Sequence, residues 1–270
     1  MKLVPVLVFL CLSLCVFGQK KKSKTVSPAV MTATMPAVDT FKSDVFAGLN
    51  MRSIGPALVS GRITQVVVNP KKFSEYYVVT ASGGIWKTIN AGTTYTPIFD
   101  KYGSYSMGTL TMDPSNSAVL WLGTGENNNQ RSIAYGDGIY KSEDAGKSWK
   151  NMGLKSSEHI GSIVVDPTNS DIVYVAVYGP LWSSGGERGI YKTIDGGKNW
   201  KSILNVSEHT GFNEIHMDPR NVNVLYACAH QRQRKVFTYI GGGPESAMYK
   251  STDARATWNK VGGGFPSGKD

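Results

Sequence analysis

Three glutamates of this 270-residue chain lie where a carboxylate could take part in catalysis. Glu126 follows a hydrophobic run, and Glu158 and Glu208 lie in two similar pentapeptides, SEHIG and SEHTG. Hydrolysis of a glycosidic bond needs two carboxyl groups about 5–10 Å apart, one acting as an acid and the other as a base or nucleophile. Spacing along the chain singles out no pair among these three residues and Glu214, so the catalytic assignment stays open.

A second group of side chains could bind a ligand. These are amides, arginines, histidines and aromatic rings, which suit sugar hydroxyls with stacked rings, or a peptide backbone with acidic side chains. The predicted ligand-binding residues are Asn127, Asn128, Asn129, Gln130, Arg131, His159, Trp182, His209, Gln231, Arg232, Arg234 and Tyr239. Ordinary solvated loops have a similar composition, so an absence of specific binding is the competing interpretation.

The two histidines of the pentapeptides occupy equivalent positions, His159 and His209, 50 residues apart. We expect them to lie side by side near a central axis, with one glutamate beside each. The corresponding positions earlier in the chain are Ser60–Arg62 and Ser106–Gly108, which contain no histidine. A metal ion would need three or four such ligands, so we predict no metal site and no cofactor.

Four copies of one short string predict the elements that position these side chains. The strings are TINAGTTY from Thr88, SEDAGKSW from Ser142, TIDGGKNW from Thr193 and STDARATW from Ser251. They share the pattern Ser/Thr-x-Asp-x-Gly-x-x-aromatic, and their starts are 54, 51 and 58 residues apart. Recurrence at this period indicates stacked supersecondary units.

Each string has the composition of a hairpin turn. The side-chain oxygen at its third position can accept hydrogen bonds from nearby backbone N–H groups, and the glycine tolerates a left-handed conformation. We therefore predict a structural role for the residues at the third position, Asn90, Asp144, Asp195 and Asp253. The first string departs from the pattern in having asparagine there, and the fourth has Arg255 in place of glycine.

Hydrophobic runs between turn signals predict four strands in each unit. Runs rich in Val, Ile, Tyr and Trp read as strands, and Asn-Pro or Asp-Pro dipeptides initiate turns. The dipeptides are Asn69-Pro70, Asp113-Pro114, Asp166-Pro167 and Asp218-Pro219. Four antiparallel strands repeated about every 50 residues predict an all-β β-propeller. Its four blades are expected at about 49–104, 105–156, 157–206 and 207–270, in an incomplete ring.

The long connections of all blades are expected at one end of the propeller. With strands A to D in chain order, the A–B and C–D connections share one end, and the B–C and D–A connections share the other. The interval from the Asx-Pro turn to the following string is 19 residues in the first unit and 29, 27 and 33 in the others. The extra residues fall in B–C connections, and variable insertions at one end of a repeat array often mark its binding face.

The four strings resemble Asp-box, or BNR, repeats, which occur in sialidases, xyloglucanase-type glycoside hydrolases and the luminal propeller of sortilin-like receptors. The resemblance covers roughly Met51–Trp258 and is greatest to secreted bacterial sortilin-like proteins, also described as BNR-repeat glycosyl hydrolases. It implies a recognition or scaffold propeller that binds protein, peptide or glycan through its B–C loops. The alternative that it implies is a glycoside hydrolase with part of its catalytic groups in further blades.

Two departures weigh against transferring the enzymatic chemistry. The xyloglucanase-like enzymes have a catalytic Asp in a Thr-Asp-x-Gly-Gly stretch of the first blade, and here Thr80–Gly84 reads TASGG, with Ala81 at that position. Sialidases have an arginine cluster, a tyrosine nucleophile and an Arg-Ile-Pro motif, which Met51–Pro56 (MRSIGP) matches only loosely. The resemblance therefore favours binding over catalysis.

The first 48 residues differ in composition from the rest. Residues 1–18 have one lysine and a long apolar run, typical of a signal peptide, and residues 19–48 form a Lys/Ser/Thr/Pro-rich segment typical of a disordered leader. The formal net charge is +9, and five lysines among the first 24 residues contribute more than half of it. We therefore predict a secreted, periplasmic or cell-surface protein without a membrane span and without nucleic acid as a partner.

Overall fold

Alternating apolar residues and Asx-Pro turns fold this chain into β-sheets in a computed structural model that describes residues 61–128, 133–254 and 257–263. The predicted signal peptide (1–18) and leader (19–48) lie outside these residues. Within the described part, no helix has the length and apolar character needed to cross a membrane. The all-β prediction is confirmed for the described residues, whose regular elements are all strands.

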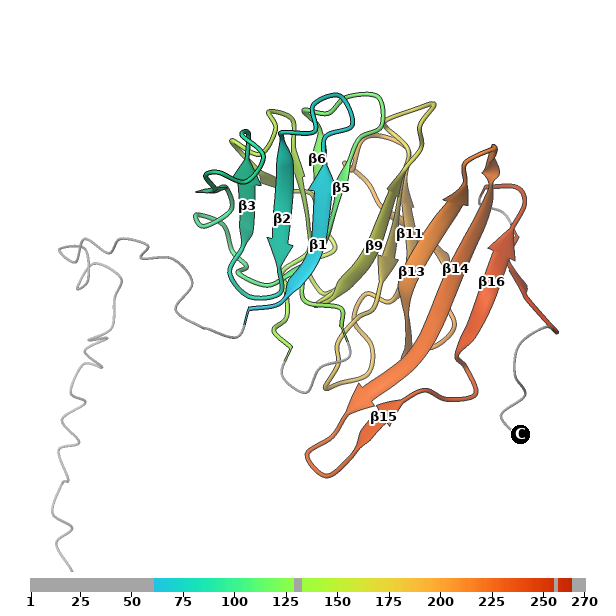
Figure 1. Cartoon of the computed structure of the whole chain (residues 1–270). Helices are drawn as coiled ribbons and strands as arrows, with labels where there is room; N and C mark the ends of the chain where they lie inside the picture. Colours follow the sequence, from blue (N-terminus) through green and yellow to red (C-terminus); the bar gives the residue numbers. More distant parts are fainter. Residues whose placement is uncertain (1–60, 129–132, 255–256, 264–270) are drawn as a thin grey trace, which may run out of the picture. The chain divides into compact units, whose positions relative to one another are not determined.

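Four antiparallel sheets follow one another along the chain (Figure 1). The first contains β1 (Ile63–Val68), β2 (Tyr76–Thr80), β3 (Ile85–Thr88) and β4 (Thr96–Pro97). The second contains β5 (Met107–Met112), β6 (Leu120–Thr124), β7 (Ile139–Ser142) and β8 (Lys150–Asn151). The third contains β9 (Ile160–Val165), β10 (Val173–Val177), β11 (Gly189–Thr193) and β12 (Lys201–Leu204). The fourth contains β13 (Thr210–Asp218), β14 (Asn221–Arg234), β16 (Ala247–Ser251) and β17 (Asn259–Lys260), with β15 (Tyr239–Gly241) paired to β14.

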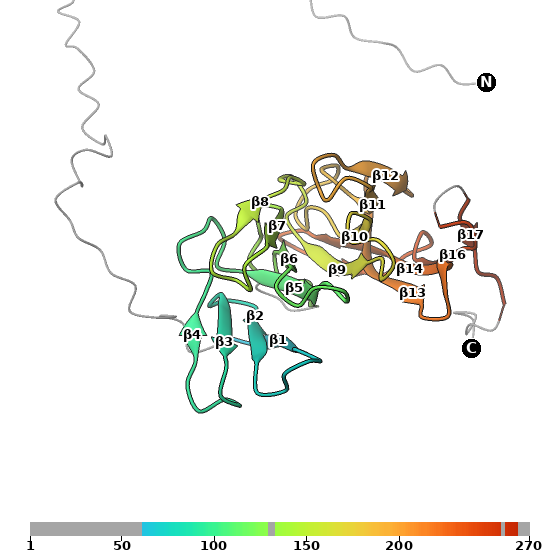
Figure 2. The same ribbon diagram turned by 90° about the horizontal axis from the view of Figure 1, so that it is seen from above.

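The sheets are arranged like the blades of a propeller. The first strands of neighbouring sheets contact each other, β1 with β5, β5 with β9, and β9 with β13 (Figure 2). Apolar side chains fill the space between successive sheets, as Tyr77 and Val79 of β2 do against Leu110 and Leu122 of the second sheet. Because each core lies between two blades, one blade cannot bury its apolar faces alone. Within the described residues, the four blades do not close a ring.

The fourth blade differs from the expected strand–loop–strand pattern. Its second strand, β14, is 14 residues long and extends beyond the sheet, where Arg232, Gln233 and Arg234 pair with Gly241, Ile240 and Tyr239 of β15. The sequence suggested a loop here because polar residues interrupt the apolar run. Backbone pairing with β15 satisfies the N–H and C=O groups without needing apolar side chains. The result is a ribbon that projects from the blade (Figure 1).

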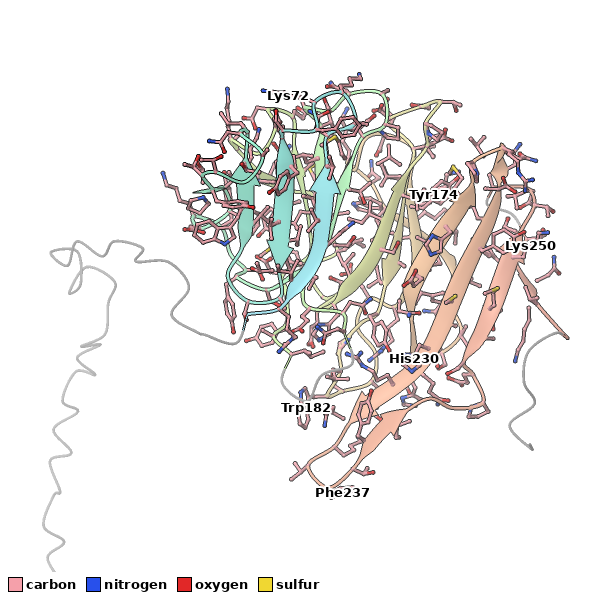
Figure 3. The ribbon with its side chains drawn as sticks, viewed as in Figure 1. Lys72, Tyr174, Trp182, His230, Phe237 and Lys250 are labelled. Atoms are coloured by element: carbon pink, nitrogen blue, oxygen red, sulfur yellow. The ribbon has the colours of Figure 1, made fainter. Side chains whose placement is uncertain are left out.

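Because the strands of each blade are antiparallel, the A–B turns and the B–C connections lie at opposite ends of the sheets. Lys72, in the A–B turn of the first blade, lies at one end of the sheets, and Trp182 and Phe237 lie at the other (Figure 3). Trp182 belongs to the B–C connection of the third blade, and Phe237 to the tip of the ribbon of the fourth. The B–C connections of these two blades therefore share one end, which we call the loop end; the opposite one is the box end.

The Asp-box hairpins repeat one hydrogen-bond pattern. In the second box, Asp144 Oδ1 accepts from Ser142 Oγ at 2.8 Å and from the Ser148 backbone N–H at 2.9 Å. Asn90 Oδ1 accepts in the same way from Thr88 Oγ1 and from the Thr94 N–H, both at 3.0 Å. The equivalent bonds reach Asp195 from Thr193 Oγ1 and the Asn199 N–H, and Asp253 from Ser251 Oγ and the Thr257 N–H. An asparagine side chain thus makes the bonds of the aspartate.

These bonds also perturb the carboxylates electrostatically. Hydrogen bonds from the Ser148 side chain and backbone lower the pKa of Asp144 to about 2. Those from Asn199 do the same for Asp195. A carboxylate that accepts several hydrogen bonds is stabilised in its charged form. The box aspartates therefore serve as ionised hydrogen-bond acceptors in the hairpins.

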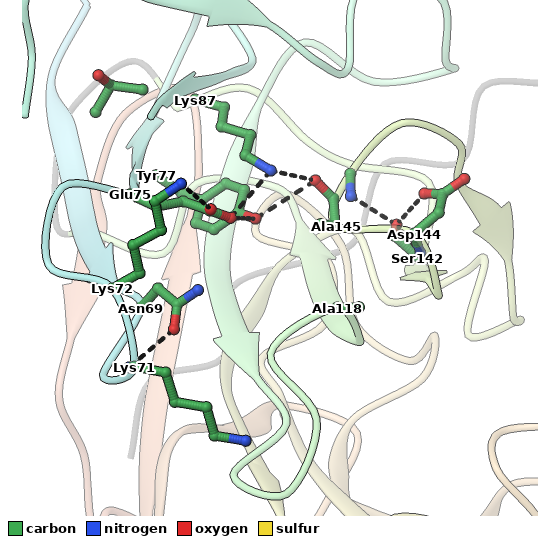
Figure 4. A network of polar contacts seen from close by, with 12 residues as sticks. Asn69, Lys71, Lys72, Glu75, Tyr77, Lys87, Ala118, Ser142, Asp144 and Ala145 are labelled. Atoms are coloured by element: carbon green, nitrogen blue, oxygen red, sulfur yellow. Dashed lines mark hydrogen bonds and ion pairs between the residues drawn. The ribbon is translucent and has the colours of Figure 1, made fainter. Parts of the chain in front are cut away.

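The box backbone also links neighbouring blades (Figure 4). The carbonyl oxygen of Ala145, in the second box, accepts from Lys87 Nζ at 3.1 Å and from the Tyr77 hydroxyl at 3.4 Å, both in the first blade. In the same way, Lys192 and Tyr174 of the third blade donate to Ala254 in the fourth box. Lys87 and Lys192, each directly before a box string, make this contact, whereas Lys141 pairs with Glu143 at 2.7 Å. The contact therefore joins the first blade to the second and the third blade to the fourth.

Candidate functional site

A cavity of about 480 Å³ lies at the loop end. B–C and D–A connections of the first three blades supply its walls, so it is built from the segments that the repeat pattern places at one end. Its lining residues are Arg62, Ser82, Tyr105, Glu126, Ile133, Ala134, Tyr135, Glu158, His159 and Trp182. Four of them, Glu126, Glu158, His159 and Trp182, are among the residues proposed from the sequence.

Glu126 is held by an ion pair across two blades. Its carboxylate accepts from Arg62 Nε and Nη2, each at 2.7 Å, in a two-point contact. The Glu126 side chain is only 2% exposed, whereas that of Arg62 is 36% exposed. The backbone N–H of Glu126 donates to Ser106 Oγ at 3.0 Å. Both ends of the residue are thus fixed, and the carboxylate has a single orientation in the cavity wall.

Glu158 lies next to Glu126 because two backbones approach closely. The Glu158 carbonyl oxygen accepts from the Gly136 N–H at 2.6 Å, and a Cβ at Gly125 would collide with that same oxygen. Glu158 itself has a left-handed φ of 52°, which is uncommon for a non-glycine residue. Burial raises the pKa of its carboxyl group, with an opposing effect from the Arg188 charge. The cavity therefore contains two carboxyl groups in different environments.

His159 is a second buried polar residue in the lining of the cavity. It is 2% exposed, and burial, aided by the charge of Arg232, lowers its pKa to about 4. The imidazole is consequently neutral at pH 7. His209 has a different environment, since its side chain is 46% exposed and contacts Glu208 at 3.5 Å. Neither His209 nor Glu208 lines the cavity, so only the first of the two pentapeptides contributes to it.

The loop that carries Trp182 is held by a buried arginine, Arg188. Its guanidinium donates to the carbonyl oxygens of Tyr178 at 2.8 Å, Gly185 at 2.8 Å and Ser183 at 2.9 Å, and also to that of Pro180. These bonds fix the loop on either side of Trp182, whose own side chain is 56% exposed. An exposed indole on a rigid loop is suited to stacking against a ligand.

The remaining predicted ligand-binding residues lie away from the cavity lining. Asn127 donates to the Asn213 carbonyl at 3.3 Å, and the Asn128 carbonyl accepts from Arg232 at 3.3 Å. On the ribbon, Arg234 stacks over Tyr239 at 4.5 Å. Gln231 accepts from the Glu245 N–H. Asn129, Gln130 and Arg131 lie outside the described residues.

Sequence reasoning did not select Arg62, Tyr105 and Tyr135, which also line the cavity. The signal for Arg62 was its position: it precedes the first strand of its blade, where His159 stands in the third blade. Tyr105 lies in the next such connection, two residues before β5. A search of every D–A connection for polar and aromatic residues would have found both.

A second cavity, of about 440 Å³, lies at the box end. It is lined by Lys192, Ile194, Asp195, Asn199, Trp200, Lys201 and Ile203. Asp195 and Asn199 are engaged with each other in the third box hairpin, with Asn199 Nδ2 donating to Asp195 at 2.7 Å. This cavity therefore lacks free carboxylates.

Comparisons with known proteins identify the fold. The family model described as "Sortilin, neurotensin receptor 3" matches residues 137–265. An ancestral GH74 enzyme superimposes with a TM-score of 0.59 at 21% identity over 77% of this chain and 26% of its own. The chain has the fold of a BNR-type β-propeller. The GH74 xyloglucanase from Xanthomonas campestris superimposes with a TM-score of 0.54 at 16% identity. This superposition covers 77% of this chain and 31% of that enzyme.

One relative is similar in sequence over a shorter stretch. A probable oligoxyloglucan-reducing end-specific xyloglucanase from Neosartorya fischeri is 31% identical over 99 residues, which is 35% of this chain and 10% of that protein. The aligned part of this chain therefore covers a tenth of this relative and about a quarter to a third of the GH74 enzymes. These likenesses establish the type of propeller and leave its activity to be argued from the site.

Proposed function

We propose that the loop-end cavity binds a glycan. The observation that carries this proposal is the combination of exposed aromatic rings with immobilised polar groups in one cavity. Tyr105, Tyr135 and Trp182 are 60%, 72% and 56% exposed, respectively, while Glu126 and His159 are buried in the wall. Aromatic faces stack on the apolar face of a sugar ring, and fixed polar groups select its hydroxyls.

The likeness to GH74 enzymes and to a xyloglucanase supports a glycan over a peptide or protein ligand. A glycan also fits the proposed secretion, because a signal peptide at residues 1–18 would bring the propeller into contact with extracellular polysaccharides. If the ligand were instead a protein or peptide, an array of glycans and peptides would show binding to the peptides and not to the glycans.

Replacement of Trp182 by alanine tests the aromatic part of the proposal. We expect the Kd for the glycan to rise about 5- to 150-fold, because loss of the indole face removes about 1–3 kcal/mol of stacking and burial. The midpoint of thermal unfolding should change little, since the side chain is 56% exposed. Isothermal titration calorimetry of both proteins provides the measurement. Unchanged affinity in W182A would contradict a role for the aromatic rim.

A second candidate function is hydrolysis of the bound glycan. The specific observation in its favour is that Glu126 and Glu158 line the same cavity in unlike environments. Burial raises the pKa of Glu158, as a general acid requires, while the Glu126 carboxylate accepts two hydrogen bonds from Arg62. In this scheme Glu158 protonates the glycosidic oxygen and Glu126 acts as the base or nucleophile.

The substitution Glu158→Gln separates the two functions. If the site is hydrolytic, E158Q should reduce the rate of reducing-end release from the bound polysaccharide by about 10²-fold or more, because the acid is lost. Its affinity for the glycan should change by less than about fivefold, since glutamine keeps the size and polarity of glutamate. A wild-type protein that binds glycan and releases no reducing ends over hours would leave binding as the function.

A further inference from the structure

Two sheet faces of the propeller have no neighbouring blade among the described residues. They belong to the first and the fourth blade, at the two ends of the arc that the blades form (Figure 2). The other faces of the four sheets pack against each other in three apolar cores, one between each pair of successive blades. We call the two remaining surfaces the first-blade face, with Val66 and Val68, and the fourth-blade face, with Tyr226, Met248 and Lys250.

The fourth-blade face repeats positions that are buried in the other three blades. Tyr226 lies opposite the lysine that precedes the box string, and it is partly exposed. Its counterparts by strand register are at most 1% exposed: Tyr77, Trp121 and Tyr174. Met248, two residues before that lysine, is also partly exposed. Its counterparts are completely buried: Ile85, Ile139 and Ile190.

The first-blade face shows the same contrast on the opposite side of the sheet. Val66, in the first strand of its blade, pairs with Val78 and is 52% exposed. Val68, two residues further along β1, is 43% exposed. The residues at the position of Val66 in the other blades are 0–5% exposed: Leu110, Ile163 and Ile215. Each of these three is covered by the preceding blade, which the first blade lacks within the described residues.

Two of the three interfaces between blades contain the same hydrogen bond. Lys87 donates to the Ala145 carbonyl, and Lys192 to the Ala254 carbonyl, so the donor lies on one blade and the acceptor in the box of the next. Each of these lysines also lies over the aromatic ring opposite it, with Nζ 5.2 Å and 4.7 Å from the centroid, respectively. The acceptor is the fourth residue of its box string in both cases.

The two faces supply one partner each for a further contact of this kind. On the fourth-blade face, Lys250 Nζ lies over the Tyr226 ring at 5.3 Å from the centroid, as in the other blades. In the first box, the fourth residue is again an alanine, Ala91, with a left-handed φ of 54° against 58° for Ala145. Its N–H donates to the Ser74 carbonyl, as that of Ala145 does to the Ala118 carbonyl. The fourth blade therefore presents the donor and the first blade the acceptor.

We propose that the fourth-blade face binds the first-blade face of a second copy of this chain. Lys250 then donates to the Ala91 carbonyl, while Tyr226 and Met248 pack against Val66, which continues the packing between successive blades. Two copies joined twice in this head-to-tail manner contribute four blades each, and a closed ring of a propeller typically has four to eight blades. Closure buries both apolar faces. This inference is independent of the glycan-binding proposal.

Analytical ultracentrifugation of the full chain over a range of concentrations measures the association, and we expect a dimer. The substitutions V66E and M248E should each raise the dissociation constant of the dimer by about 100-fold or more, because each places an unpaired charge in an apolar contact. V236E is the matched control, since it makes the same change as V66E at the tip of the ribbon, where Val236 is 98% exposed. It should leave the dimer intact.

A mixture of the two variants tests the head-to-tail direction of the contact. V66E keeps an unaltered fourth-blade face and M248E an unaltered first-blade face, so one contact can still form between them. We expect monomers of each variant alone and dimers in the equimolar mixture, weaker than those of the wild type. A contact between two identical faces would be lost in only one of the variants. Recovery of the dimer on mixing also shows that both variants are folded.

The substitution K250M tests the hydrogen bond. Loss of one donor at each of the two contacts should raise the dissociation constant about fivefold or more. K260M removes the same charge from the same blade, but Lys260 lies opposite Tyr249 and therefore on the other side of the sheet from Lys250. The dimer of K260M should resemble that of the wild type.

Three results would overturn the proposal. The first is a wild-type chain that is monomeric at every concentration, which would leave blades of a different protein as the partner of these faces. The second is a dimer that V66E and M248E do not weaken. The third is an equimolar mixture of the two variants that stays monomeric although each variant unfolds cooperatively on heating. Glycan binding at the loop-end cavity is measured separately and would stand in all three cases.

Discussion

Replacement of Gly125 by alanine is expected to destabilise the propeller by about 3 kcal/mol or more and to abolish binding at the loop-end cavity. Gly125 has a φ of 85°, and a Cβ there would collide with the backbone of Glu158. The left-handed conformation costs a non-glycine residue about 1–2 kcal/mol, and forcing two backbones apart adds about 1–3 kcal/mol. The displaced backbone carries Glu126 on one side and Glu158 on the other, so the cavity loses the relative position of both carboxylates.

The control for this substitution is Gly185→Ala. Gly185 also has a left-handed φ, 77°, but a Cβ there would meet no atom within 4 Å. Only the cost of the left-handed conformation remains, so the free energy of unfolding of G185A should be lower by about 1–2 kcal/mol. Urea denaturation of the three proteins measures the difference. Equal loss of stability in G125A and G185A would show that the close approach between Gly125 and Glu158 does not exist.

Replacement of Trp121 by alanine is expected to cost about 3–5 kcal/mol of the free energy of unfolding. Trp121 on β6 is fully buried between the second and third blades, where it packs edge-on against Trp200 at 6.1 Å. Lys141 lies over its ring at 5.3 Å. It occupies the position of Tyr77 and Tyr174 in the neighbouring blades, so its loss opens a cavity in an interface that the propeller repeats.

The same substitution at Trp182 is the matched control. Trp182 is 56% exposed at the loop end, and surface substitutions usually change stability by about 0.5 kcal/mol or less. In chemical denaturation, W121A should therefore have a much lower free energy of unfolding than W182A. Glycan affinity, in contrast, should fall in W182A. If W121A were as stable as W182A, the second and third blades would not pack against each other through Trp121.

The repeat allowed the fold to be predicted from the sequence. A box hairpin is defined by contacts within seven or eight residues, such as those of Asp144 with Ser142 and Ser148, so its pattern is visible in the string. The Asx-Pro turns are equally local: Asp113 Oδ1 accepts from the Ser115 N–H at 2.8 Å, and Asp166 Oδ1 from the Thr168 N–H at 2.8 Å. Because these local contacts recur at a fixed period, the sequence was sufficient to predict the type of blade.

The site was only partly predictable, because its contacts join residues far apart in the sequence. The B–C and D–A rule selected Glu126, Glu158, His159 and Trp182, which line one cavity. It did not distinguish the buried His159 from the partly exposed His209, since burial depends on the packing of the neighbouring blades rather than on the pentapeptide. Nor did it indicate that Arg62 pairs with Glu126, 64 residues away, in place of a partner on its own blade.

The ribbon of the fourth blade shows another limit. Residues 230–235 are polar and basic, and polar character suggested a loop, but backbone hydrogen bonds can pair any alternating segment that has a partner strand. The tip of the ribbon, with Val236 and Phe237 98% and 88% exposed, has no packing partner among the described residues that a sequence pattern could reveal.

Crystals of the chain grown with the tightest-binding oligosaccharide give the most direct test of the central claim that the loop-end cavity is the binding site. We predict electron density for a sugar ring against the Trp182 indole, with further sugar atoms within hydrogen-bond distance of Glu126 or His159. Density in the box-end cavity beside Trp200, with the loop end empty, would contradict the account.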